Sequence, residues 1–298
     1  MKRRIKYTRS DVIFQAVNTF FLVALLLIIL YPLYFVVIAS ISSPTEVAAG
    51  RVLLWPRGIS LTGYKQVLSD NDVIFGYRNT ILYTILGTTI NIILTMTAGY
   101  ALSVDFVGKG PLMLFFSFTM FFSGGMIPAY FLMRDLHLLD TVWAMVLPGA
   151  VSVYNMMITR TFIAGNIPQA LFESAELDGC SRIRFFIYIV IPLSGVLMAI
   201  LTLFYGVAHW NSYFNAILYI SKRERFPLQL VLREILILNK VSASDMANTD
   251  PELLAQMQDT ADLMKYSLII ISSLPVLILY PFLQRFFVKG VMIGSVKG

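Results

Sequence analysis

The chain has 298 residues, of which 57% are hydrophobic and only 13% charged, and its mean hydropathy is +0.74. These proportions exclude an ordinary soluble domain and are typical of a membrane protein. The net charge of +6 does not indicate nucleic-acid binding, because no basic domain carries it and cationic residues beside membrane spans account for it.

A basic amino-terminal segment, MKRRIKYTR, precedes an uncharged stretch from Val12 to Thr45. The apolar region of a secretory signal peptide is shorter than this and ends in small residues. We therefore expect the stretch to stay in the protein as a first span over residues 15–41. Because cationic segments remain in the cytoplasm, the amino terminus is predicted to be cytoplasmic.

Five further uncharged runs approach or exceed the roughly 20 residues that a helix needs to cross a bilayer. They predict spans at residues 79–104, 111–133, 141–160, 186–212 and 264–286. An even number of spans returns the carboxyl terminus to the cytoplasm. The expected fold is therefore an all-α polytopic membrane protein with six transmembrane helices, forming a single transmembrane domain over residues 1–298.

This topology places the loops 42–77 and 222–265 outside the cell and the loop 161–185 in the cytoplasm. The second outer loop is polar and mixed in charge. Two interpretations of it stay open: a solvated cap over the spans, and a contact surface for an external protein that delivers substrate.

A short helix is expected in the cytoplasmic loop, within the stretch NIPQALFESAELDGC. Asn166 is predicted to cap its first turn, with Gln169 three residues later as in a capping box. Gly179 is predicted to end it, because glycine most easily takes the left-handed conformation just past a helix.

The acidic residues Glu173, Glu176 and Asp178 lie in the second half of this predicted helix, where the helix dipole disfavours negative charge. A solvated loop helix and an exposed knob held by another protein both fit these residues. The acidic residues alone do not separate the two interpretations.

No Asp, Glu, Lys or Arg lies well inside a predicted span, so a proton relay or a charged coupling site has no carrier. The chain also has no glycine-lysine phosphate-binding loop of its own. The sequence therefore predicts no enzyme and no cofactor or metal in this chain, and an energy source in a partner that hydrolyses ATP.

Neutral polar and aromatic side chains occur in the spans instead, a combination that suits the hydroxyls and C–H faces of a sugar. The candidate residues for a substrate pathway are Asn91, Tyr154, Asn155, Tyr205, Trp210, Asn211, Tyr213 and Asn215. Two other interpretations stay open: Asn91 bonding across helices, and the 210–215 cluster forming an interfacial aromatic belt. His209 alone is interpreted as a satisfied polar residue.

A different class of function is an intramembrane hydrolase with Ser123 as nucleophile and His209 as base. Rhomboid-type proteases have a glycine two residues before the serine, where this chain has Phe121. Such an enzyme would also have no use for the cytoplasmic loop. A purely structural membrane subunit is the third alternative, and a transport assay separates it from a permease.

The loop resembles the EAA coupling loop of ABC importer permeases, whose pattern is E-A-A, three residues, G, nine residues, then I-x-L-P. Glu173, Ala175 and Gly179 match it, as do Ile189 and Pro192, while Ser174 and Ile191 replace an Ala and a Leu. The stretches FFSGGMIP, LPGAVSVYN, HWNSYFNAILYI, PLQLVLREIL and QRFFVKGVMIGSVKG extend the resemblance to the carbohydrate branch, and to the oligosaccharide and polysaccharide-fragment members within it.

The resemblance implies a type I ABC importer permease in a bacterial cytoplasmic membrane. Its expected partners are a second, different permease subunit, two cytoplasmic ABC ATPase subunits, an extracellular solute-binding protein, an oligosaccharide substrate and the lipid bilayer, with no nucleic acid. The residues implied in coupling to the ATPase are Glu173, Ser174, Ala175, Glu176, Asp178, Gly179, Lys289 and Lys297.

Overall fold

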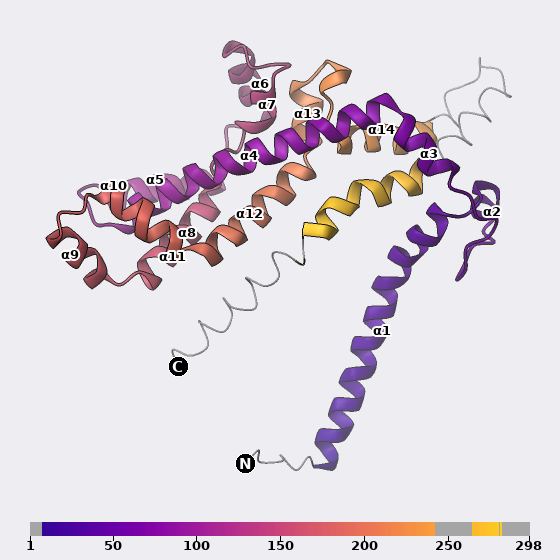
Figure 1. Cartoon of the computed structure of the whole chain (residues 1–298), viewed down its shortest axis with the longest axis horizontal. Helices are drawn as coiled ribbons and strands as arrows, with labels where there is room; N and C mark the ends of the chain where they lie inside the picture. Colours follow the sequence, from indigo (N-terminus) through magenta and orange to yellow (C-terminus); the bar gives the residue numbers. More distant parts are fainter. Residues whose placement is uncertain (1–7, 242–263, 280, 282–298) are drawn as a thin grey trace. The chain divides into compact units, whose positions relative to one another are not determined.

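The computed structural model describes residues 8–241, 264–279 and 281, and this part of the chain consists of helices joined by loops, with no strand (Figure 1). The chain divides into two compact units. The first comprises residues 1–69 and 235–271, and the second comprises residues 70–234 and 272–298.

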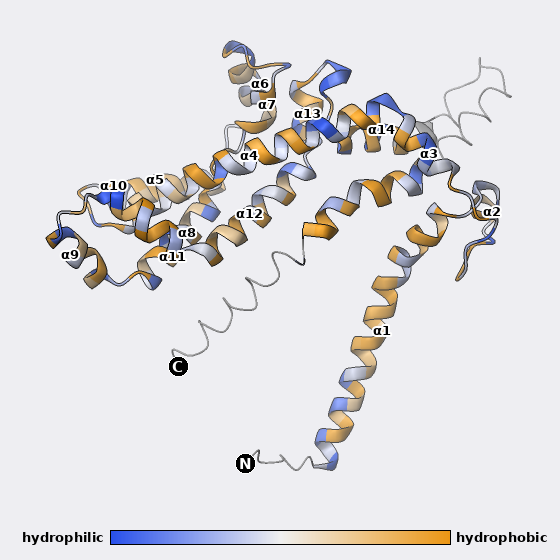
Figure 2. Ribbon diagram, viewed as in Figure 1, coloured by the Kyte–Doolittle hydropathy of each residue, from blue (hydrophilic) through white to orange (hydrophobic). Residues whose placement is uncertain are grey.

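The first unit contains α1 (Arg9–Ser40), α2 (Pro44–Ala48) and α3 (Thr62–Ser69). A capping box between Thr8 and Asp11 starts α1. Apolar residues run along most of α1 (Figure 2), and their side chains are exposed, which fits a helix that faces lipid. At the carboxyl end of α1, the backbone carbonyl of Ser40 accepts a hydrogen bond from the hydroxyl of Ser267 at 3.4 Å.

The second unit is built around α4 (Asn71–Ser103), which packs against α8 (Val153–Asn166) and α12 (Gly195–Trp210). Its other helices are α5 (Lys109–Phe121), α6 (Met126–Asp135), α7 (Val142–Val146), α9 (Gln169–Leu177), α10 (Arg182–Phe185), α11 (Ile191–Leu193) and α13 (Phe214–Tyr219). A π-helical turn (Phe186–Val190) and a 3₁₀ turn (Arg223–Arg225) connect some of these, and α14 (Leu228–Val241) crosses the boundary between the units.

Among the described residues, two continuous helices, α1 and α4, are long and apolar enough to cross a bilayer. Two pairs of consecutive helices are also long and apolar enough when each pair is taken together. They are α5 with α6, bent by 110°, and Arg182–Leu193 with α12, bent by 80°. The predicted span 111–133 covers the first bent pair, and 186–212 covers most of the second. The predicted span 141–160 covers α7, a loop and part of α8.

Each bend has a local cause. Gly125 between α5 and α6 takes a φ of +88°, which favours glycine over any residue with a side chain. In the second pair the break lies at Ser194, two residues after Pro192, which has no N–H to continue the α-helical ladder, and a π turn precedes it.

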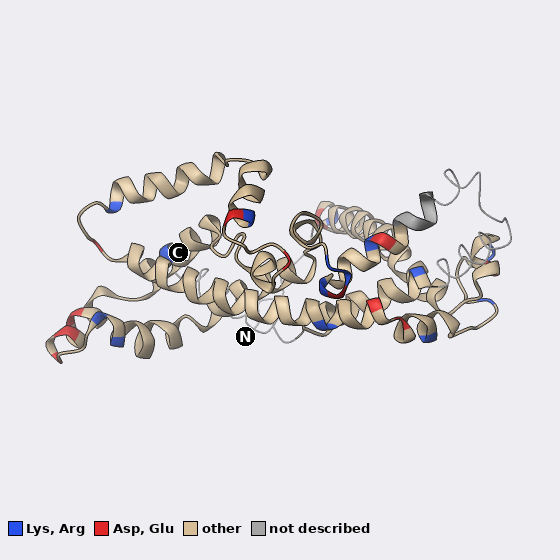
Figure 3. Ribbon diagram, turned by 90° about the horizontal axis from the view of Figure 1, so that it is seen from above, with Lys and Arg blue, Asp and Glu red and all other residues tan. Residues whose placement is uncertain are grey.

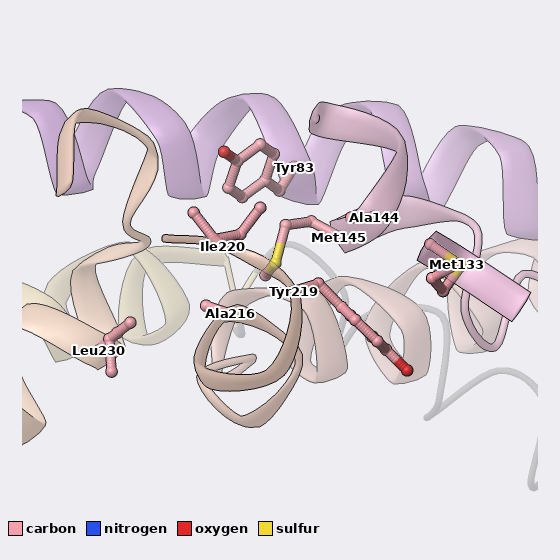
Figure 4. Close-up of a cluster of buried hydrophobic side chains, with 8 residues drawn as sticks. All are labelled: Tyr83, Met133, Ala144, Met145, Ala216, Tyr219, Ile220 and Leu230. Atoms are coloured by element: carbon pink, nitrogen blue, oxygen red, sulfur yellow. The ribbon is translucent and has the colours of Figure 1, made fainter. Parts of the chain in front are cut away.

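The core of the second unit near the Asn71 end of α4 joins residues far apart in sequence. Figure 4 shows this cluster, whose buried members are Tyr83, Met133, Ala144, Met145, Ala216, Tyr219, Ile220 and Leu230. Charged residues lie mainly in the loops and near helix ends, and the long helices carry few along their length (Figure 3). Both features agree with spans whose middle is apolar.

α4 carries a stripe of small or polar residues at every fourth position, all of them buried: Asn79, Tyr83, Gly87, Asn91, Thr95 and Gly99. Residues four apart form a ridge that is inclined to the helix axis, so the stripe winds slowly around α4 as it runs along it. Small residues let two helix backbones approach closely, which is how helices pack in a bilayer. The stripe therefore explains why α4 is the axis of this unit.

We expect Gly99→Ala to destabilise the protein by about 1–3 kcal/mol, because the added methyl group overpacks this stripe. A Cβ at this position would lie 2.4 Å from Cγ2 and 2.7 Å from Cβ of Thr159. Thr159 is fully buried, and its hydroxyl donates to the carbonyl of Asn155 at 2.8 Å, so it has little room to move. The matched control is Gly165→Ala on α8, which meets nothing within 4 Å. Thermal unfolding in detergent measures both, and equal melting temperatures would contradict the packing argument.

Candidate functional site

The helix expected in the 161–185 loop is α9, and its apolar face packs on a small core. Ile163, Phe185 and Val190 are the buried centre of this core, and Leu171, Phe172 and Ala175 of α9 lie against it. The rings of Phe172 and Phe185 meet edge to face, with centroids 5.2 Å apart. This packing fixes α9 to α8 and to the element that leads into α12.

The carboxyl end of α9 is closed by the backbone. Gly179 takes a φ of +74°, and its N–H donates to the carbonyl of Glu176 at 3.0 Å. The N–H of Cys180 donates to the carbonyl of Ala175 at 2.9 Å. This pair of bonds is a Schellman motif, and it confirms that Gly179 ends the helix as predicted.

The predicted start of α9 is wrong. Asn166 is the last residue of α8, and its side-chain amide donates to the carbonyl of Phe162 at 2.9 Å instead of capping the next helix. Pro168 occupies the cap position, with no side-chain hydrogen bond. A residue before proline avoids the helical region, so Ile167 is extended and the cap falls at Pro168, two residues later than predicted.

The other face of α9 is exposed. Glu173, Ser174, Glu176 and Asp178 are all exposed, and Leu177 at the tip is 90% exposed. Within the described part of the chain, none of the three acidic side chains forms an ion pair. The helix therefore presents an acidic surface with one large apolar side chain at its end.

A recess of about 390 Å³ lies beside the base of α9, lined among others by Tyr100, Gln169 and Phe172. Two hydrogen bonds tie the neighbouring segments together. The Tyr100 hydroxyl donates to the carbonyl of Arg182 at 3.2 Å, and Nε of Arg160 donates to the carbonyl of Leu102 at 3.3 Å. These bonds connect the Ser103 end of α4 to the segments that carry α9, so a displacement of α9 acts on the end of α4.

Several candidate pathway residues form a buried polar network between α4 and α12. The side-chain amide of Asn91 donates to the carbonyl of Gly149 at 3.0 Å, and its oxygen lies 2.9 Å from Nε2 of His209. The hydroxyl of Tyr205 lies 2.7 Å from that of Thr95. These contacts match the interpretation that Asn91 bonds across helices and that His209 is a satisfied polar residue.

The remaining candidates divide by exposure. Asn155 and Trp210 are buried, and the indole N–H of Trp210 donates to the carbonyl of Ser272 at 2.9 Å. Tyr154, Asn211 and Tyr213 are exposed, and Asn215 is half-buried. Lys289 and Lys297 lie outside the described residues. Within the described residues, no group of three His, Cys, Asp or Glu side chains is placed to hold a metal ion.

The α4 stripe of small and polar residues was missed from the sequence, although its spacing of four was readable there. Thr95 belongs to it and completes the network through Tyr205. A second feature that was missed lies at the Asn71 end of α4. There the side-chain amide of Asn79 donates to the carbonyls of Glu224 at 2.7 Å and Phe226 at 3.1 Å.

No protein-family profile matches the chain. The chain does match individual proteins. It is 37% identical over 279 residues to the polygalacturonan/rhamnogalacturonan transport system permease protein YtcP of Bacillus subtilis, a match that covers 93% of this chain and 96% of YtcP. It is 25% identical to the arabinooligosaccharides transport system permease protein AraQ of Halalkalibacterium halodurans, over 91% of this chain and 92% of AraQ.

The fold also matches a solved structure. A chain in the crystal structure of a bacterial ABC transporter involved in the import of the acidic polysaccharide alginate superposes with a TM-score of 0.85 and 32% sequence identity. The match covers 95% of this chain and 100% of that chain. Agreement over nearly the whole length, in sequence and in structure, shows that this chain belongs to the family of sugar ABC transporter permeases.

Proposed function

We propose that this permease carries an oligosaccharide or polysaccharide fragment across a bacterial cytoplasmic membrane, driven by ATP hydrolysis in partner subunits. The observation that carries the proposal is the 37% identity to YtcP over 93% of the chain. The relatives are named for polygalacturonan/rhamnogalacturonan, arabinooligosaccharides and alginate. The proposed assembly contains a second permease subunit, two ABC ATPases and an extracellular solute-binding protein.

The proposed topology has six spans with both termini in the cytoplasm. Hydrogen bonds between loops assigned to the same side support it. Asp140 follows the predicted span 111–133 and so lies on the outer side of this topology, and it accepts from the backbone N–H groups of Ser221 at 2.6 Å and Lys222 at 3.0 Å, where the outer loop 222–265 begins. At the opposite end of α4, Tyr100 is bonded to the predicted cytoplasmic loop through Arg182.

The proposed contact with the ATPase is the exposed face of α9. Its packing core holds the helix rigidly, and its acidic side chains have no ion-pair partner among the described residues. A force on α9 would then reach α12 through the bent element that contains Pro192. Access alternates when the ATPases move this helix between two positions.

The proposed sugar contacts are the exposed or half-buried candidates Tyr154, Asn211, Tyr213 and Asn215. Their aromatic faces and amides suit the C–H faces and hydroxyls of a sugar. The buried candidates Asn91, Tyr205 and Trp210 join neighbouring segments through side-chain hydrogen bonds, and Asn155 is buried in α8.

Co-purification with the candidate ATPase and second permease tests the proposal, followed by ATP hydrolysis with and without oligosaccharides and the binding protein. We expect a stable complex whose ATP hydrolysis rises with ligand and binding protein together. Membrane insertion with no ATPase association would contradict the proposal. It would return attention to a structural subunit or to a hydrolase acting through Ser123.

A further inference from the structure

A recess of about 560 Å³ at the Asn71 end of α4 is not used by the coupling helix or by the buried polar network. Residues from three separate segments line it: Arg78, Asn79 and Tyr83 from α4, Trp143 from α7, and Glu224 and Arg225 from the 3₁₀ turn. We call it the cationic recess. It combines the guanidinium groups of Arg78 and Arg225 with the aromatic face of Trp143, three residues that are far apart in the sequence.

Hydrogen bonds from α4 fix one wall of the cationic recess. Asn79 is 4% exposed, and its amide holds the carbonyls of Glu224 and Phe226 at 2.7 and 3.1 Å. The hydroxyl of Tyr83 donates to the carbonyl of Arg225 at 2.9 Å. These three hydrogen bonds hold the backbone carbonyls of Glu224, Arg225 and Phe226. The Cα atom of Arg225 is therefore fixed relative to α4.

A second anchor lies just before this turn. Asp140 accepts hydrogen bonds from the backbone N–H groups of Lys222 and Ser221, and these bonds hold the pKa of the Asp140 carboxyl below its ordinary value. The carboxylate is therefore ionised and engaged with the backbone. It forms no ion pair with Arg225 within 4 Å, so it leaves that guanidinium available.

The two arginines of the cationic recess differ from their neighbour Arg223. Arg223 pairs with Asp72 at 2.6 Å and with Glu234 at 3.5 Å. Within the described residues, Arg78 and Arg225 form no ion pair, although Glu224 lines the same recess. With one carboxylate against two guanidinium groups, the recess keeps a net positive charge.

The chemistry of these groups selects an anion of a particular shape. A guanidinium presents a planar fork of N–H donors that matches both oxygens of a carboxylate. The ring of Trp143, 45% exposed, offers a flat face of the kind on which the C–H side of a sugar ring packs. A sugar that carries a carboxylate uses both features at once, whereas a small inorganic anion uses only the first.

We propose that the cationic recess binds carboxylate groups of an acidic oligosaccharide at the outer mouth of the permease. This inference rests on the proposed function and deepens it by naming the substrate class. It assigns Arg78 and Arg225 to the carboxylates and Trp143 to the sugar ring. Glu224 opposes the binding of an acidic ligand and limits its affinity.

The test uses the full reconstituted complex and two matched probes, oligogalacturonides and the same oligosaccharides with methyl-esterified carboxyl groups. ATP hydrolysis is measured against probe concentration for wild type, Arg78→Gln, Arg225→Gln, Glu224→Gln and Lys222→Gln. Lys222 is exposed on the same loop but does not line the recess, so it controls for loss of a nearby charge. Repeating the titrations at high ionic strength reports how much of the preference is electrostatic.

We expect wild type to prefer the acid over the ester, and each arginine variant to weaken the response to the acid about tenfold, the size of one lost charge-assisted contact. The response to the ester should stay within about twofold. Glu224→Gln should strengthen the response to the acid, and Lys222→Gln should behave as wild type.

Other outcomes overturn the inference in distinguishable ways. Equal wild-type responses to acid and ester would overturn it while the proposed function stands. An equal loss for both probes in the arginine variants would also overturn it, and would make the recess a docking surface for the solute-binding protein. No response of the wild-type complex to any oligosaccharide would instead contradict the proposed function itself.

Discussion

Glu173→Lys and Gly179→Asp should each reduce ligand-stimulated ATP hydrolysis and uptake at least tenfold, with the amount of permease in the membrane unchanged. Glu173 is exposed on α9 and forms no ion pair within the described residues, so reversing its charge breaks no ion pair there. The change falls on the surface that we propose for the ATPase. Reversing a charge in such a contact weakens binding to the partner.

Gly179→Asp acts mainly through charge. The φ of +74° at Gly179 is a conformation that aspartate and asparagine both tolerate, and a Cβ there meets nothing within 4 Å. The variant therefore keeps the end of α9 and adds another negative charge beside Asp178. Gly179→Asn is the matched control, since asparagine fits the same conformation and adds no charge.

Membrane fractions and reconstituted ATP hydrolysis separate insertion from coupling in these variants. A charge reversal at Asp135, exposed on α6 and paired with its exposed neighbour Arg134 at 2.9 Å, controls for a general effect of surface charge, because an ion pair at the surface contributes little. Normal uptake in both α9 variants would contradict a coupling role for this helix.

Phe185→Ala should uncouple transport by removing the support of α9. Phe185 is 2% exposed and meets Phe172 at 5.2 Å between ring centroids. Truncating a buried phenylalanine typically costs about 3–5 kcal/mol. Because this core joins α9 to α8 and to the element before α12, we expect the loss to appear as local detachment of α9.

Limited proteolysis over residues 169–178, together with ligand-stimulated ATP hydrolysis, measures this effect. The variant should be cleaved faster there than wild type and should lose stimulation. Ile183→Ala is the control, because Ile183 is 73% exposed two residues away and its truncation should cost less than about 0.5 kcal/mol. Wild-type cleavage and stimulation in Phe185→Ala would show that this core does not support coupling.

Features set by local chemistry were predictable from the sequence. The end of α9 at Gly179 depends on the conformational limits of that single residue. The start of α9 was not predicted correctly, because Asn166 continues α8 and the restriction before Pro168 moves the break. Two local rules competed there, and the sequence alone did not rank them.

Features that depend on distant segments were out of reach. Asn79 and Glu224 are 145 positions apart, and only the folded chain brings them together. Trp143 and Arg225 are likewise far apart in the sequence, and both line the cationic recess in the folded chain. The α4 stripe was accessible, since its period of four is visible in the sequence, but small residues in a span carry no signal in hydropathy.

Site-specific cross-linking from the tip of α9 tests the central claim most directly. Cys180 is the only cysteine, so a Cys180→Ser background allows a single probe at Leu177→Cys. Val107→Cys, in the loop between α4 and α5, is the control, because both native side chains are at least 90% exposed. We predict that the probe at residue 177 cross-links to the ATPase with a yield that changes with nucleotide. Cross-linking from residue 107 but not from residue 177 would contradict the assignment of α9 as the coupling helix.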